Sequence, residues 1–237
     1  MDITAGPMEI GPTTHYMMGG VRVDAETGAS TKRGLFAAGE VAGGMHGANR
    51  LGGNSLSDLL VFGQRTGAAA AAAAATEADI PWVSPIQVGE AMAELDAPLE
   101  RPHGEDPYRI QADLQATMQT LVGIFRTESD LDEAIGRIAE LRRRWSAIRV
   151  GGGRVFNPGW NLVTELRNLI IVSESIVRSA RLRTESRGAH SRLDYPTADP
   201  KWATVNCFTV RDGQSMRVET APLPTLPAEL GALAAKG

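Results

Sequence analysis

The stretch of this 237-residue chain that decides its fold begins with GLFAAGE at residues 34–40. A short apolar run that ends in a glycine and an acid is typical of a buried strand in an α/β sheet. Before it, residues 16–23 read as a strand, a glycine turn and a second strand, and residues 24–28 carry a turn signal. The sequence therefore predicts extended segments that lead into a loop.

That loop carries five glycines between residues 41 and 53 and is followed by a predicted helix. The helix begins near Asn54 and Ser55, either of which is a suitable N-cap, and continues into the alanines at 68–75. A helix N-terminus attracts anionic groups, which is how α/β sheets hold nucleotide cofactors. On the pattern alone, however, simple turns are the commoner explanation of a glycine loop.

The proline content rises after this helix. Residues 77–106 contain four prolines and predict a surface connection at a domain boundary. From residue 107 to about 186, apolar residues recur at helical spacing in three segments, which predicts a small bundle. Residues 202–210 alternate like a strand, and the tail after Pro222 predicts loose or weakly helical structure.

Composition also excludes several classes of function. The net charge of −4 gives no electrostatic case for nucleic acid, and one cysteine, Cys207, excludes a disulfide framework within the chain. The four histidines have no partners at metal-ligand spacing, so no metal site is expected. The N-terminus lacks the features of a secretory signal, and no apolar run is long enough to cross a bilayer. Any membrane association would go through a partner.

Four motifs, in order, resemble the flavoprotein subunits of succinate dehydrogenases and fumarate reductases. They are HYMMGG at 15–20, GLFAAGE at 34–40, HGANRLGGNSL at 46–56 and RTESRGAHSR at 183–192. The resemblance implies an α+β chain: the C-terminal part of an α/β FAD-binding domain, a three-helix bundle-like domain and a short mixed tail. The corresponding ranges are 1–76, a linker at 77–106, 107–196 and 197–237.

The resemblance also implies roles for individual residues. Glu40 matches the acid that holds the ribityl hydroxyls of FAD, and Ser55 and Leu56 match positions whose backbone faces the flavin. His15 and Arg50 match residues that grip one carboxylate of succinate or fumarate. The residue types suit the task, because arginine offers a planar fork to a carboxylate and histidine donates a further hydrogen bond.

Other residues are expected to be structural. His46 is read as a structural histidine, and RTESRGAHSR as an ion-pair network at a helix end without a catalytic role. Three of the site residues also have a structural alternative: His15 as a satisfied histidine, Arg50 as a cap of the glycine loop, and Glu40 as a cap of the following turn.

The family's dinucleotide fingerprint, its FAD-carrying histidine and the capping domain with the proton-transferring arginine match nothing in this sequence. No catalytic residue is therefore expected within these 237 residues, and the chain alone is expected to bind FAD weakly and to lack activity. For the parent protein the resemblance implies hydride transfer between FAD and succinate or fumarate. Electrons would pass to an iron–sulfur subunit, then to a quinone, with membrane anchor subunits holding the complex on the cytoplasmic face of the plasma membrane.

Two alternatives remain open at the level of sequence. A soluble flavoenzyme of the L-aspartate oxidase type shares much of this pattern, although such enzymes usually have Ala-Ser where this chain has Gly52 and Gly53. The second alternative is a non-catalytic fragment that serves as an interaction module.

Overall fold

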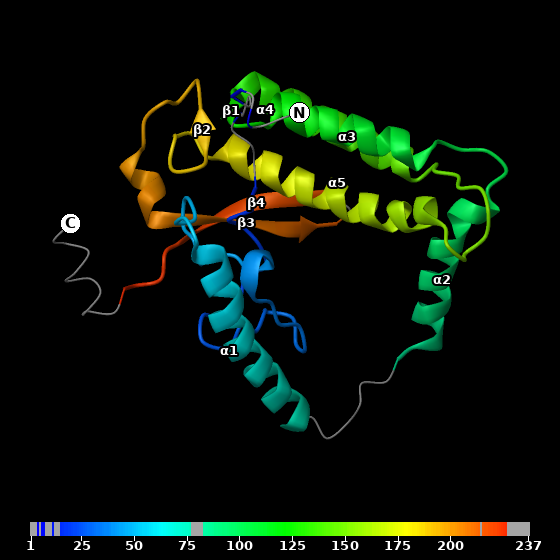
Figure 1. The fold of residues 1–237 in the computed structure, drawn as a ribbon, viewed down its shortest axis with the longest axis horizontal. Coiled ribbons are helices and arrows are strands. Elements are labelled where there is room, and N and C mark those ends of the chain that lie inside the picture. Colours follow the sequence, from blue (N-terminus) through cyan, green and yellow to red (C-terminus); the bar gives the residue numbers. More distant parts are fainter. Residues whose placement is uncertain are drawn as a thin grey trace. The chain divides into compact units, whose positions relative to one another are not determined.

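The computed structural model describes residues 4, 6, 7, 11, 15–76, 83–213 and 215–226. The chain divides into two compact units, Met1–Trp82 and Val83–Gly237. The boundary falls within the stretch that the sequence predicts as a linker. The elements are mixed α and β, as expected, and are drawn in Figure 1.

The first unit is built on one long helix, α1 (Asn54–Thr76), preceded by a 3₁₀ turn, η1 (Gly39–Val41). The predicted helix is confirmed; because Asn54 is its first residue, Gly53 precedes it and neither proposed N-cap stands at the cap position. The predicted turn at 24–28 is also present and packs on α1. At Gly28 (φ +69°) an added Cβ would lie 2.1 Å from Oγ1 of Thr66, so only glycine allows this approach.

The predicted strand at residues 34–39 is wrong. Phe36 forms one isolated antiparallel bridge with Ala29, and Gly39 already belongs to η1. Val21 likewise makes only a single parallel bridge with Ala42. A strand exists only where a neighbour completes its hydrogen-bond ladder, and the described part of this unit contains no such ladder. The segment is nevertheless buried at Ala37 and Gly39, as an interior position requires.

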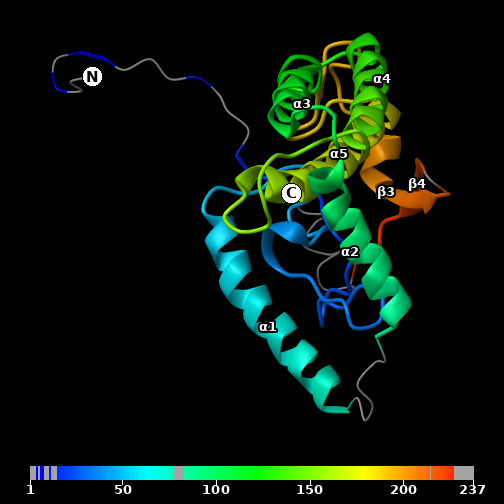
Figure 2. The same ribbon diagram turned by 90° about the vertical axis from the view of Figure 1, so that its right-hand side faces the viewer.

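The second unit is built around three helices, as predicted: α3 (Pro107–Leu121), α4 (Glu128–Trp145) and α5 (Pro158–Leu182). Each begins with a side-chain cap, from Asp106, Thr127 and Asn157. The three helices pack against one another (Figure 2). Their shared core includes the fully buried residues Ile110, Leu131, Ile138, Leu166 and Val177.

A fourth helix, α2 (Pro85–Glu100), occupies the region expected to be irregular, so that expectation does not hold there. Pro85 stands in the first turn, where its missing N–H costs nothing, and Ser84 caps the helix. The indole of Trp160 on α5 donates to the carbonyl of Leu95 at 2.6 Å and ties α2 to the bundle.

Short strands complete this unit. β1 (Phe125–Arg126) pairs in parallel with β2 (Ser191–Arg192). The 3₁₀ helix η2 (Pro200–Thr204) precedes β3 (Val205–Asp212), which forms an antiparallel hairpin with β4 (Ser215–Pro222) beside α5. The predicted strand at 202–210 therefore begins three residues later than expected and has an unforeseen partner.

Three expectations from composition can be compared with the described residues. Cys207 is a free cysteine. Among those residues, no group of histidine, cysteine and carboxylate side chains could hold a metal ion, and no helix has the length and apolarity to span a bilayer. Most of the predicted loose tail lies at 227–237, outside the described residues.

Candidate functional site

The predicted site residues lie in the first unit, around a close approach of two backbone segments. The N–H of Val21 donates to the carbonyl of Val41 at 2.7 Å, and the N–H of Gly43 donates back to Val21 at 2.9 Å. An added Cβ at Gly20 would lie 2.1 Å from the Val41 carbonyl oxygen, so glycine is required there. This contact lays the HYMMGG segment beside the start of the glycine loop.

Glu40 forms a second link between the same segments. It lies exposed in η1, and its Oε1 accepts a hydrogen bond from the backbone N–H of Met17 at 3.0 Å. Only one of its carboxylate oxygens is used in this bond, so the other is available to a ligand. Because Met17 is two residues from His15, Glu40 also anchors the segment that carries that histidine.

Arg50 is the most constrained of the predicted site residues. Its guanidinium carbon lies 4.7 Å from the centre of the Tyr16 ring, in cation–π geometry. Nη1 donates to the carbonyl of Leu51 at 3.3 Å, so the loop-capping alternative is partly realised. Its Nε is buried and has no hydrogen-bond partner among the described residues. A buried donor without an acceptor is unusual in a folded protein, so the hydrogen bonding of Arg50 is incomplete within the described residues.

Of the remaining predicted residues, Ser55 and Leu56 follow this arginine closely along the chain, whereas His15 lies in the separate HYMMGG segment. His15 is exposed and immediately precedes Tyr16. Ser55 and Leu56 lie in the first turn of α1, where backbone N–H groups have no partner within the helix. Ser55 is half-buried, whereas the Leu56 side chain is 68% exposed.

Sequence reasoning did not identify the cluster beneath Arg50. The hydroxyl of Tyr16 lies 3.1 Å from His46 Nε2 and 3.3 Å from Asp58 Oδ2, and the last two atoms are 3.2 Å apart. The side chains of His46 and Asp58 are only 5% and 3% exposed. One signal was available: an aspartate between Leu56 and Leu59 in an apolar helix start is rarely buried without a partner.

This environment changes the acidity of the phenol. Burial raises the pKa of Tyr16, and the nearby negative charge of Asp58 raises the same pKa further. Tyr16 therefore stays protonated and acts as a hydrogen-bond donor.

The residues present fit the edge of a flavin site. Glu40 offers a free carboxylate oxygen to sugar-like hydroxyls, and the first turn of α1 offers unpaired N–H groups with partial positive charge.

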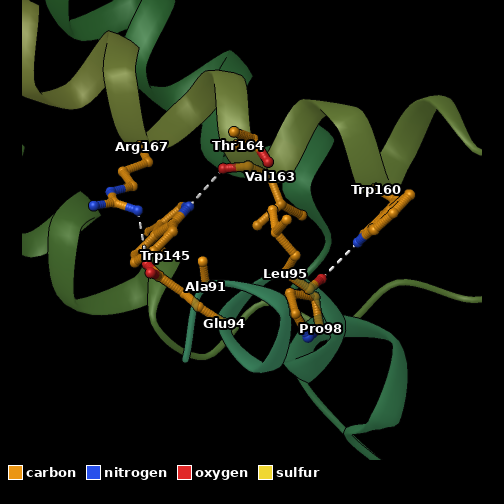
Figure 3. Close-up of a pocket in the computed structure, with 9 residues that line it drawn as sticks. All are labelled: Ala91, Glu94, Leu95, Pro98, Trp145, Trp160, Val163, Thr164 and Arg167. Carbon is orange, nitrogen blue, oxygen red and sulfur yellow. Dashed lines mark hydrogen bonds and ion pairs between the residues drawn. The ribbon is translucent and has the colours of Figure 1, made fainter. Parts of the chain in front are cut away.

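Two cavities lie in the described part of the second unit, and neither is lined by a predicted site residue. One, of about 160 Å³, lies between α2 and α5 beside Trp145 and Trp160 (Figure 3). The other, of about 640 Å³, lies under the β3–β4 hairpin. The Glu94–Arg167 ion pair, at 2.8 Å, stands where the two adjoin.

The segment at 183–192 forms an ion-pair network, as expected. Glu185, fully buried, pairs with Arg183 and Arg187 at 2.7 and 2.9 Å. Arg192, also fully buried, pairs with Asp194 at 2.7 Å. Every charge in this group has an opposite partner, which is typical of a structural role.

Comparison with known proteins places the chain in a family. Residues 1–56 match the family model described as FAD binding domain. Residues 111–230, half of the chain, match the model described as fumarate reductase flavoprotein C-term. The chain belongs to the succinate dehydrogenase and fumarate reductase flavoprotein family. The members of this flavoprotein family are FAD-dependent oxidoreductases, so FAD is the expected cofactor and the resemblance seen in the sequence is confirmed.

Three relatives illustrate the match within the flavoprotein family. The fumarate reductase flavoprotein subunit of Haemophilus influenzae is 40% identical over 81% of this chain and 33% of its own length. Mycobacterium smegmatis Sdh1, solved in complex with UQ1, is 46% identical with a TM-score of 0.89, covering 100% of this chain and 40% of that one. Escherichia coli quinol fumarate reductase is 34% identical with a TM-score of 0.88, covering 96% and 40%. The chain thus spans well under half the length of these flavoproteins.

Proposed function

We propose that this chain supplies part of the active site of a flavoenzyme that interconverts succinate and fumarate. The observation that carries the proposal is Arg50, a half-buried guanidinium held against Tyr16 with a buried, unpartnered Nε. It lies in the glycine loop that leads directly into the first turn of α1. An arginine fixed in this way is suited to one carboxylate of a C4 dicarboxylate.

His15 is proposed as the second residue on that carboxylate. It is exposed and adjacent in sequence to Tyr16, so the segment that carries it is fixed by the same contacts. A histidine N–H and an arginine fork together hold a carboxylate in one orientation. Orientation matters because holding the reacting carbon still supplies much of the rate enhancement.

Glu40, Ser55 and Leu56 are proposed as the flavin-contacting residues. Glu40 would accept hydrogen bonds from the ribityl hydroxyls, and the backbone of Ser55 and Leu56 would face the flavin ring at the positive end of α1. When bound, FAD supplies hydride transfer to and from the substrate carbon. The residues of this chain bind and orient the substrate; none of them is assigned a proton transfer.

The proposed partners and location are supported by membership of the family rather than by the site. We propose that electrons pass to an iron–sulfur subunit, then to a quinone. Membrane anchor subunits would hold the complex on the cytoplasmic face of the plasma membrane. The supporting observation is similarity to a quinol fumarate reductase and to an Sdh1 complex. Co-purification of the native enzyme with an iron–sulfur polypeptide is the expected result, whereas peroxide production from aspartate would favour the oxidase alternative.

Arg50→Ala in the native flavoenzyme tests the proposal. If Arg50 binds the carboxylate, kcat/KM for succinate should fall by the equivalent of about 2–5 kcal/mol, as for a buried charge pair that loses one partner. The measurement is steady-state succinate oxidation with an artificial electron acceptor.

A matched control is available on the helix that follows the loop. Arg65 in α1 is an exposed arginine paired with Glu26, away from the loop. Arg65→Ala should leave kcat/KM within about twofold of wild type, because exposed ion pairs contribute little. Equal kcat/KM for the Arg50→Ala and wild-type enzymes would exclude Arg50 from substrate binding.

A further inference from the structure

Tyr16, His46 and Asp58 have no role in the function proposed so far, yet their side chains form a connected polar group in the first unit. They come from three different segments: the extended HYMMGG strip, the glycine loop and helix α1. Their three polar atoms form a triangle with sides of 3.1, 3.2 and 3.3 Å. Such a triangle locks the three segments together at one point.

The proton arrangement in this triangle follows from its geometry. A carboxylate can only accept hydrogen bonds, so the hydroxyl of Tyr16 donates to Asp58 Oδ2. His46 Nε2 also faces that oxygen, and two acceptors would repel each other, so Nε2 carries a hydrogen and donates as well. Asp58 is thereby the common acceptor of the group.

These hydrogen bonds determine the orientation of the Tyr16 ring. Its hydroxyl is fixed by Asp58, and the His46 ring meets it edge-on, with centres 5.2 Å apart and planes at 80°. The face of the ring then supports the guanidinium of Arg50 at 4.7 Å. An arginine side chain has many rotamers, and a fixed aromatic face selects among them.

We propose that Tyr16, His46 and Asp58 are positioning residues that orient the guanidinium of Arg50 for carboxylate binding. The inference rests on the function proposed above and extends it to residues that do not touch the substrate. The buried Asp58 carboxylate accepts from the hydroxyl at the edge of the ring, and Arg50 lies over the face of the same ring, so one aromatic side chain links the buried acid to the arginine.

The test is the affinity of the native holoenzyme for malonate, a dicarboxylate that does not react, measured by calorimetry. Tyr16→Leu, which removes both the ring and the hydroxyl, should weaken malonate binding about tenfold. Tyr16→Phe keeps the ring and its volume and should weaken binding about threefold, through the lost hydrogen bond to Asp58. Tyr108→Leu, at an exposed tyrosine of α3, should leave the affinity unchanged.

A double-mutant cycle separates positioning from a general structural effect. In an Arg50→Gln background, which has no cation to stack on the ring, Tyr16→Leu should change the malonate affinity by less than about twofold. If Tyr16→Leu has the same effect in both backgrounds, the residue acts independently of Arg50 and the inference is wrong.

Two outcomes distinguish this inference from the proposed function. If the wild-type holoenzyme does not bind malonate, the proposed dicarboxylate site is wrong, and the positioning inference is wrong with it. If the wild-type holoenzyme binds malonate and both Tyr16 variants bind it as tightly as wild type does, only the positioning role is wrong.

Discussion

At the scale of single residues, Glu185 shows how the helical unit uses buried charge. Its carboxylate accepts hydrogen bonds at 2.8–3.0 Å from Arg183, Arg187 and the backbone N–H of Asp199. Burial by itself would raise the pKa of Glu185, but these hydrogen bonds outweigh it and lower the pKa to about 2. The residue therefore connects the end of α5 with the segment before η2.

Glu185→Gln should lower the free energy of unfolding by on the order of 3 kcal/mol, because it leaves two arginines without a counter-charge. The folded pKa lies below the ordinary value of 4.5, so the stabilisation is complete above pH 4.5 and is lost as the pH falls toward 2. Denaturant unfolding of the wild-type protein and the Glu185→Gln variant across that pH range measures the difference in their free energies of unfolding.

Glu133→Gln is the matched control, because Glu133 makes an exposed ion pair with Arg137 one turn further along α4. Its effect should stay below about 0.5 kcal/mol. Equal losses for the two variants would show that burial of Glu185 gives it no special importance.

The residues of the site differed in how far sequence could identify them. Arg50, His15 and Glu40 stand in motifs that can be read locally, and the structure places them around one backbone crossing. Tyr16 and Asp58 are 42 residues apart, and only the fold shows that they meet. His46 completes this cluster through a contact rather than through a motif. The sequence alone therefore predicted only an ordinary structural histidine at this position.

At the scale of elements, local signals predicted the helices of the bundle well. Asp106 and Thr127 cap α3 and α4, and such caps are local signals because they depend on residues next to one another in sequence. The strand at 34–39 failed for the opposite reason, since a strand depends on a neighbour that the pattern does not show. Strand β4 was missed although Asp212-Gly213, a common hairpin signal, precedes it.

Thr127→Ala should destabilise the helical unit by about 1 kcal/mol, because Oγ1 of Thr127 caps α4 by accepting from the N–H of Asp130 at 3.2 Å. Thermal unfolding followed by circular dichroism is the measurement. Thr127→Ser keeps the hydroxyl and should retain most of the stability. If the serine variant is as unstable as the alanine variant, the methyl group and not the cap is responsible.

At the scale of the whole molecule, the two units differ in core packing and in the residues proposed to bind ligands. The second unit has a continuous apolar core and balanced buried charges. The first unit carries all the proposed binding residues but keeps large apolar side chains exposed, with Leu51 and Leu60 at 74% and 75%. The chain also spans only 33% of the length of the Haemophilus influenzae subunit and 40% of that of Mycobacterium smegmatis Sdh1. We therefore propose that these residues form one wall of a binding site and that the rest of the parent flavoprotein would supply the other walls.

If this wall holds one carboxylate of the substrate, the structure of the native holoenzyme with bound malonate should show it. We expect one malonate carboxylate to lie about 2.7–2.9 Å from the Arg50 guanidinium, with His15 donating to the same group. A malonate bound elsewhere, with Arg50 still turned to the Leu51 carbonyl, would mean that neither residue binds the substrate.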